Sequence, residues 1–231
     1  MIAYKTLVQN CALSLVILLT CNLANADMFV DRSVVIFDAE SKPREDVKIS
    51  NSGDENIYVQ VEVLEVSNPG TKEEERIRVT DPKKLKLIAT PNKLVIPPGG
   101  QKLVRIVNLA GQDSKEHVYR INVTPILAPL EDDTSQLRIV VAYQILTIVQ
   151  AKKPSTSLNV ERKGKTITFH NQGNTNLLLA DGRQCDQDNQ CQDLTSKRLY
   201  AGNTWVLSLP LNAPVTYSIR SFDGIKKEVY Q

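Results

Sequence analysis

The chain has 231 residues, of which 42% are hydrophobic and 23% are charged, and its formal net charge is +2. This is the composition of an ordinary globular protein with room for one or two domains. The near balance of charges excludes the strongly basic surface that nucleic-acid-binding proteins need. We therefore expect no nucleic-acid partner and no broad disorder.

The first 26 residues have the pattern of a secretory signal peptide. Lys5 provides a positive charge, an apolar run follows from residue 7 to 19, and Ala-Asn-Ala at 24–26 forms a cleavage site. The run is too short to span a membrane, so we expect an exported protein that is not membrane-embedded. A lipid on Cys21 is the alternative, although Thr20 before it is unfavourable.

Removal of the signal peptide leaves two cysteines, Cys185 and Cys191. In the oxidising compartment that an exported protein enters, two cysteines indicate one structural disulfide. The bond would close a small ring, which limits its stabilisation to about 2 kcal/mol. Because no histidine lies near these cysteines, a metal site is less favoured, and we expect neither a metal nor a cofactor.

Short apolar stretches separated by turn residues fill the segment from 27 to 152. Alternation is clear in the strand expected from residue 57 to 66, where every second residue is apolar. Turn sequences such as Asn-Ser-Gly-Asp at 51–54 and Pro-Pro-Gly-Gly at 97–100 separate these stretches. This pattern is typical of a β-sandwich, and no segment keeps a helical period.

The longest expected strand runs from residue 137 to 149. A polar, proline-containing break follows at 151–155, and we place the domain boundary there. Residues 153–231 repeat the pattern of short strands and turns. The sequence thus predicts an all-β protein with two immunoglobulin-like sandwiches, in segments 27–152 and 153–231.

The sequence shows no set of residues in the pattern of an enzyme active site. Its two histidines, His117 and His170, lie in expected strands without a nucleophile motif nearby. Acidic runs at 73–75 and 132–133 are better explained as solvated loops than as a pair of differently tuned carboxylates. We therefore expect a binding protein and not an enzyme.

Several short motifs, in this order and spacing, resemble chaperones of the chaperone–usher pilus pathway. The likeness is greatest to the alternate, or alpha, class that serves colonisation-factor-type fimbriae. The matching stretches lie at 68–71, 89–99, 104–105, 116–120, the alternating run that ends at Tyr143, the turn at 171–174 and the Cys185/Cys191 hairpin.

This resemblance implies two immunoglobulin-like domains in a boomerang arrangement. It also implies a periplasmic chaperone that stabilises pilus subunits by donor-strand complementation and delivers them to an outer-membrane usher. A pilin that lacks one strand exposes its core, and a donated strand fills the gap with main-chain hydrogen bonds and alternate side chains. The donor side chains expected here are Leu137, Ile139, Val141 and Tyr143. Alternatively, this face of the strand packs into the protein's own core.

Family members of the better-known classes anchor the C-terminal carboxylate of the pilus subunit with an arginine and a lysine. In this chain the arginine position falls on Val34 and the lysine position near Leu146 or Thr147, so the basic pair is missing. The remaining candidates for the cleft are Arg32, Arg105, Tyr119 and Arg120. For Arg105, which lies within an apolar strand, a structural ion pair is favoured over subunit contact. Alternation allows only one of Tyr119 and Arg120 to face the cleft directly.

Two other functions remain open from the sequence. A secreted pilin or adhesin-like structural subunit would have an N-terminal donor extension and an incomplete sandwich, whereas both sandwiches here are expected to be complete. A secreted enzyme on a sandwich scaffold would need a metal or nucleophile cluster. Fold alone does not decide among these functions.

Overall fold

The computed structural model describes residues 27–38, 40, 42–109, 111, 113–126 and 140–231. Within these residues the regular structure is β-strand, apart from one 3-10 turn, η1 (Pro82–Lys84). The prediction of an all-β fold is therefore confirmed. The expected signal peptide at 1–26 lies outside the described residues.

The first sandwich consists of two sheets that enclose one core. One sheet has the order β1-β3-β8-β6, with bounds Met28–Val30, Arg44–Asn51, Gln101–Asn108 and Leu87–Thr90. The other has the order β2-β10-β9-β4-β5, with bounds Val34–Phe37, Tyr143–Val149, His117–Ile126, Ile57–Ser67 and Glu75–Ile77, and β7 (Lys93–Ile96) also pairs with β4.

The second sandwich follows the same plan with shorter strands. One sheet has the order β11-β12-β16, with bounds Leu158–Lys163, Thr166–Asn171 and Thr204–Ser208. The facing sheet has the order β14-β13-β17-β18, with bounds Cys191–Leu194, Leu177–Cys185, Val215–Ser221 and Gly224–Tyr230, and β15 (Lys197–Leu199) also pairs with β13. The predicted disulfide is present and joins β13 to β14 between Cys185 and Cys191.

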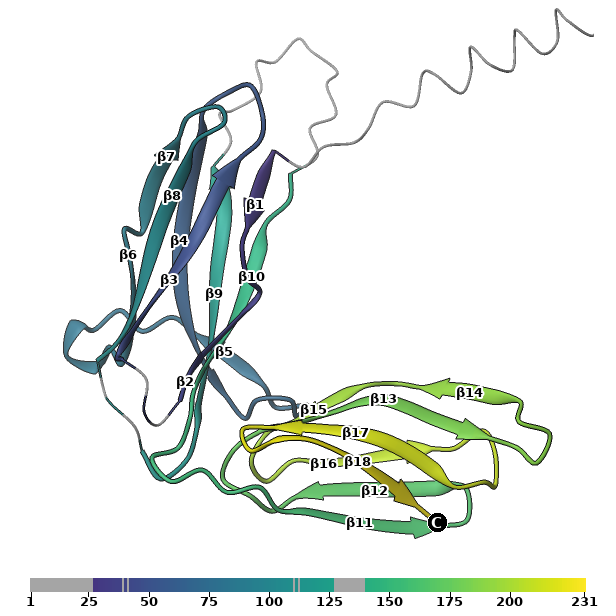
Figure 1. Ribbon diagram of the computed structural model, residues 1–231. Coiled ribbons are helices and arrows are strands. Elements are labelled where there is room, and N and C mark those ends of the chain that lie inside the picture. Colours follow the sequence, from purple (N-terminus) through teal and green to yellow (C-terminus); the bar gives the residue numbers. More distant parts are fainter. Residues whose placement is uncertain (1–26, 39, 41, 110, 112, 127–139) are drawn as a thin grey trace, which may run out of the picture.

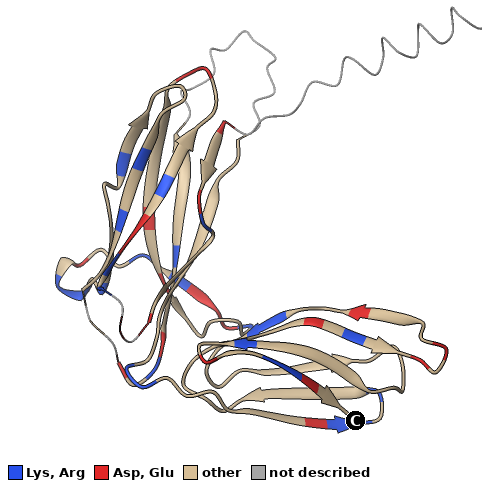
Figure 2. Cartoon of the chain, in the orientation of Figure 1, with Lys and Arg blue, Asp and Glu red and all other residues tan. Residues whose placement is uncertain are grey.

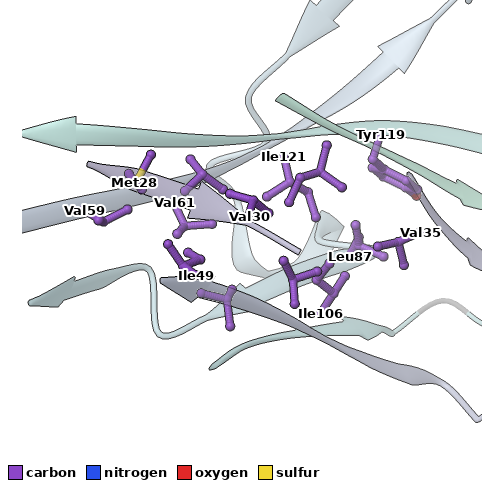
Figure 3. Packing of buried hydrophobic residues seen from close by; sticks show 14 of the residues in the cluster. Met28, Val30, Val35, Ile49, Val59, Val61, Leu87, Ile106, Tyr119 and Ile121 are labelled. Atoms are coloured by element: carbon purple, nitrogen blue, oxygen red, sulfur yellow. The ribbon is translucent and has the colours of Figure 1, made fainter. Parts of the chain in front are cut away.

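Alternating aliphatic residues from both sheets form the core of the first sandwich (Figure 3). On β4, Val59 and Val61 are buried, while Ile57 and Val63 pack against the same core, as their period of two predicts. The second core is more aromatic. The ring of Phe169 lies 5.5 Å from that of Trp205 and 5.4 Å from that of Tyr217.

A buried asparagine closes the equivalent turn in each sandwich. The Asn51 amide donates to the carbonyls of Glu55 and Ile96, and its oxygen accepts from the Gly53 N–H. Asn171 makes the same three bonds, to the carbonyls of residues 175 and 199 and from the N–H of residue 173. A side-chain amide thus satisfies backbone groups that the turn leaves without a ladder partner.

The two sandwiches meet end to end at an angle, which gives the chain a bent, boomerang-like outline (Figure 1). The chain passes from β10 to β11 at the elbow. Charged residues of both signs are spread along the strands of both sandwiches (Figure 2). The bent arrangement of two β-sandwiches agrees with the fold predicted from the sequence.

Candidate functional site

Strand β10 is paired along its full length on only one side. Its residues Tyr143–Val149 pair antiparallel with β9, but the parallel pairing with β2 covers only Leu146–Val149. From Tyr143 to Ile145, no described strand lies against the other edge. Main-chain N–H and C=O groups on an uncovered edge can pair with a strand from another chain.

Exposure increases toward the start of this segment. Ile145 is 2% exposed and belongs to the core of the first sandwich, whereas Val141, four residues earlier in the chain, is 41% exposed. Residues 140–142 are not part of the strand, which begins at Tyr143. The strand expected to begin at residue 137 is thus shorter in the part that the structure describes.

Two of the four expected donor side chains, Leu137 and Ile139, lie outside the described residues. Val141 is exposed, but Tyr143 is partly buried against the protein's own core. The Tyr143 hydroxyl donates a hydrogen bond to the Met28 carbonyl at 2.8 Å, because β1 extends as far as this point. For Tyr143 the alternative of packing into its own sandwich therefore applies.

The four cleft candidates lie in different places. Arg32 lies just before β2 and is exposed. Its Nη1 is 3.3 Å from Oε2 of Glu45 on β3, with which it forms an ion pair. Arg105 is on the outer face of the other sheet, where its Nε and Nη2 donate to the two carboxylate oxygens of Asp46. The ion pair predicted for Arg105 is thus a surface pair within the first sandwich. Both arginines are therefore engaged by carboxylates of the first sandwich.

Tyr119 and Arg120 point to opposite sides of β9. Tyr119 is 3% exposed inside the core, where burial raises its pKa, so it is not a cleft residue. Arg120 lies on the outer face, opposite Leu146 of β10 and Leu64 of β4. Its Nε is buried and has no hydrogen-bond partner among the described residues. The outer face of the sheet therefore has a cation next to the predicted lysine position.

Arg120 borders an apolar cluster that joins the two sandwiches. The cluster contains Tyr200 from the second sandwich and four side chains from the first: Val66, Val118, Leu146 and Ile148. Glu74 lies nearby. Burial alone would raise the pKa of Glu74, but a hydrogen bond from the Gly70 N–H and the charges of Arg76 and Arg120 lower it overall. Arg120 is thus in a partly desolvated site whose charges act on one another.

A buried carboxylate holds the elbow together. Glu116 Oε2 accepts hydrogen bonds from the hydroxyl of Thr175 at 3.1 Å and from the N–H and the side-chain amide of Asn176 at 2.8 Å each. Burial raises the pKa of Glu116 despite these three donors. Arg198 donates in turn to the Asn176 side chain. The sequence analysis included Glu116 in the matching stretch at 116–120 but did not predict this role, because the bonds join segments about 60 residues apart in the chain.

The described residues contain no helix of the length and apolarity needed to cross a lipid bilayer. They also contain no cluster of three or more histidine, cysteine, aspartate or glutamate side chains that could hold a metal. What stands out is structural: a half-paired strand in one sandwich, and a firmly joined elbow beside it. These features define a protein of two β-sandwiches with a sheet edge that is available for pairing with another strand.

Comparison with known proteins agrees with the family resemblance of the sequence motifs. A family model described as "Pili and flagellar-assembly chaperone, PapD N-terminal domain" matches residues 27–154, more than half of the chain. The chain therefore belongs to this family of assembly chaperones, as the sequence motifs predicted. The family is not enzymatic, and the prediction of a non-enzyme is confirmed on that ground.

Two curated Escherichia coli proteins, both described as fimbrial subunits, resemble the chain over most of its length. The protein of the CFA/I fimbriae is 24% identical, covering 79% of this chain and 81% of its own, and the protein of the CS1 fimbriae is 27% identical, covering 77% and 79%. Among solved structures, "Class 5 Fimbriae Chaperone CfaA" superposes with a TM-score of 0.63 at 20% identity, covering 88% of this chain and 99% of that chain. A structure of "Salmonella enterica SafA pilin in complex with the SafB chaperone" gives 0.65 at 14% identity, covering 89% and 96%. At these identities the solved structures establish the shared fold.

Proposed function

We propose that this chaperone works in the periplasm, where it binds fimbrial subunits through the open edge of β10 and delivers them to an outer-membrane usher. The observation that carries the proposal is the half-paired strand. Its backbone is free of described partners on one side from Tyr143 to Ile145, and the exposed Val141 directly precedes this part of the chain.

A continuous strand face would allow this segment to serve two proteins. Ile145 fills the chaperone's own core. When a bound pilin extends the strand upstream of Tyr143, the period of two would place Val141 on this same face. A pilin sandwich that lacks a strand can align there, with its core continuing that of the chaperone. The alternation in the sequence adds Leu137 and Ile139, which lie outside the described residues, to the proposed donor side chains. Burying three such side chains is worth roughly 5–9 kcal/mol before the costs of association.

We further propose that Arg120 receives the C-terminal carboxylate of the bound pilin. The family's basic pair falls on Val34 and near Leu146 or Thr147, none of which is charged, and Arg120, on the neighbouring strand β9, lies directly opposite Leu146. Its Nε has no partner among the described residues. A carboxylate would supply one, and charge-assisted hydrogen bonds of this type are strong.

Co-expression with the major pilin of the same fimbrial gene cluster tests strand donation. Val141→Asp introduces a charge into the donated row, and we expect loss of the one-to-one complex on size-exclusion chromatography while the unfolding midpoint stays unchanged. Val206→Asp is the matched control, because Val206 is 60% exposed on β16 in the other sandwich. Wild-type yields of complex from Val141→Asp would contradict the proposal.

A second pair of variants tests the anchor separately. Arg120→Gln should weaken the complex with the pilin about tenfold or more, consistent with loss of a charge-assisted bond. Arg105→Gln is the control, since Arg105 is engaged by Asp46 on a different face. Equal effects of the two substitutions, measured as Kd for a synthetic peptide of the pilin's C-terminal strand, would remove Arg120 from the site.

A further inference from the structure

The last strand of the second sandwich is an uncovered edge. β18 pairs with β17 through seven consecutive residue pairs without a bulge, and no described strand pairs with its other side. Among the described residues, Arg162 reaches the backbone at the end of this strand, with its Nη1 3.4 Å from the Tyr230 carbonyl. Long, regular edges of this kind are ready to pair with another strand.

Two exposed aliphatic side chains on this edge strand favour its association with another strand. Ile225 is 71% exposed and Val229 is 55% exposed, and both lie on the outer face of β18. Lysines commonly protect an edge strand from unwanted pairing, and β18 has two, Lys226 and Lys227. Glu228 follows them directly, however, so positive and negative charges lie side by side on the strand (Figure 2).

The order of these residues is self-complementary. We propose that β18 pairs antiparallel with β18 of a second copy of this chain, about a two-fold axis at Lys227. In that register Ile225 lies opposite Val229 of the second copy, and Lys226 lies opposite Glu228 of the second copy. The two-fold axis repeats both pairs, as it does in any isologous interface. Apolar and opposite-charge pairs across strands each stabilise pairing.

The register also separates the two kinds of contact. Lys226 and Glu228 are next to Ile219 and Tyr217 on the inner face, whereas Ile225 and Val229 are on the outer face. Within the part of the chain that the structure describes, Lys226 has a loose ion-pair partner, Asp223, at 3.8 Å. Lys227 lies opposite Lys227 of the second copy, which is the one repulsive pair in this register. Its long side chain points to the solvent on the outer face. Four favourable pairs therefore oppose one unfavourable pair.

This dimer would leave the β10 edge open, because β18 belongs to the other sandwich (Figure 1). Each dimer would thus present two pilin-binding edges at once. The inference is independent of the proposed function, since it rests on the residues of β18 alone. It assigns the second sandwich a role of its own, as the contact between chaperone copies.

Charge exchange tests the register. In sedimentation velocity at low salt and from micromolar to submillimolar concentration, we expect the purified protein to dimerise. Lys226→Glu and Glu228→Lys should each weaken the dimer about tenfold, since each replaces two attractive pairs with two repulsive ones. The double variant Lys226→Glu/Glu228→Lys restores both pairs and should recover dimerisation to within about threefold.

Covalent capture gives a second reading. Lys227→Cys should form an intermolecular disulfide under mild oxidation, because residue 227 faces itself across the axis. Lys163→Cys, at an exposed place on the edge strand β11, should not. A protein that stays monomeric throughout, a double variant as weak as the single ones, or a dimer lost in Val141→Asp but kept in Lys226→Glu would overturn the proposal.

Discussion

The two sandwiches share the same turn but differ in how their sheets end. Asn51 and Asn171 make matching sets of three hydrogen bonds at equivalent turns, and each is almost fully buried. In the first sandwich, a strand loses its second neighbour halfway along, at β10. In the second sandwich, the outermost strand β18 is regular and exposed from Gly224 to Val229, while Tyr230 packs against the core. The two turns are thus alike, whereas the two sheet edges differ, and our two proposals give each edge a separate docking role.

Substitutions on and just before β10 should give the largest difference in stability. Ile145→Asp places a charge in the core and should destabilise the first sandwich by more than about 4 kcal/mol. Val141→Asp, four residues earlier in the chain and 41% exposed, should change the free energy of unfolding by less than about 0.5 kcal/mol. Denaturant unfolding of both variants measures the difference. Equal losses would show that Val141 is part of the core and not of a docking edge.

Removal of the shared turn amide should have the next largest effect. Asn51→Ala and Asn171→Ala each leave two carbonyls and one N–H without a partner, so we expect a loss of about 3 kcal/mol in the affected sandwich. Gln172→Ala, one residue from Asn171 and exposed, is the control and should be near neutral. A large cost in one sandwich and none in the other would contradict the equivalence of the two turns.

The core of this molecule could be predicted from the sequence more fully than the candidate site. A period of two in Ile57, Val59, Val61 and Val63 is a local property, and it placed these residues correctly. The same alternation correctly grouped Tyr143 and Ile145 on one face of β10, but it did not predict that both pack with the protein's own core or where that core ends. The end of the core depends on β1, because the Met28 carbonyl on that strand accepts a hydrogen bond from the Tyr143 hydroxyl.

Polar partners that are distant in sequence could not be predicted either. An ion pair was expected for Arg105, but its partner Asp46 is 59 residues away and is brought close only by the pairing of β3 with β8. The bonds of Glu116 to Thr175 and Asn176 cross from one sandwich to the other. Such contacts depend on how the sandwiches meet, which no local pattern in the sequence records.

The elbow gives a prediction of intermediate size that depends on pH. Burial raises the pKa of Glu116 above its ordinary value of 4.5, so the folded protein holds this proton more tightly than the unfolded chain. The stabilisation from protonation is complete below that ordinary value and is lost as the pH rises through the raised pKa. Relative to Glu116→Gln, the wild-type protein should therefore gain stability on acidification.

Parallel pH series of thermal unfolding for the wild type and Glu116→Gln measure this difference. Gln keeps a carbonyl oxygen for the Asn176 donors, so at pH 7 it should be neutral or slightly stabilising, whereas Glu116→Ala removes the acceptor and should cost about 1–3 kcal/mol. Parallel curves for the wild type and Glu116→Gln at every pH would mean that the carboxylate is not desolvated at the elbow.

The smallest effect is expected on the exposed sheet of the first sandwich, where Asp46 and Arg105 pair in solvent. A side-chain hydrogen bond from Arg105 lowers the pKa of Asp46, so the stability that this pair adds is present above the ordinary value of 3.8 and is lost as the pH falls through the lowered pKa. Asp46→Asn should shift the unfolding midpoint only slightly at pH 7, because exposed ion pairs contribute little and are screened by salt. The shift should vanish in 1 M salt and at acid pH, which is the opposite of the Glu116 dependence. A midpoint shift as large as that of Asn51→Ala would mean that this surface pair, and not the buried turn, keeps the first sandwich folded.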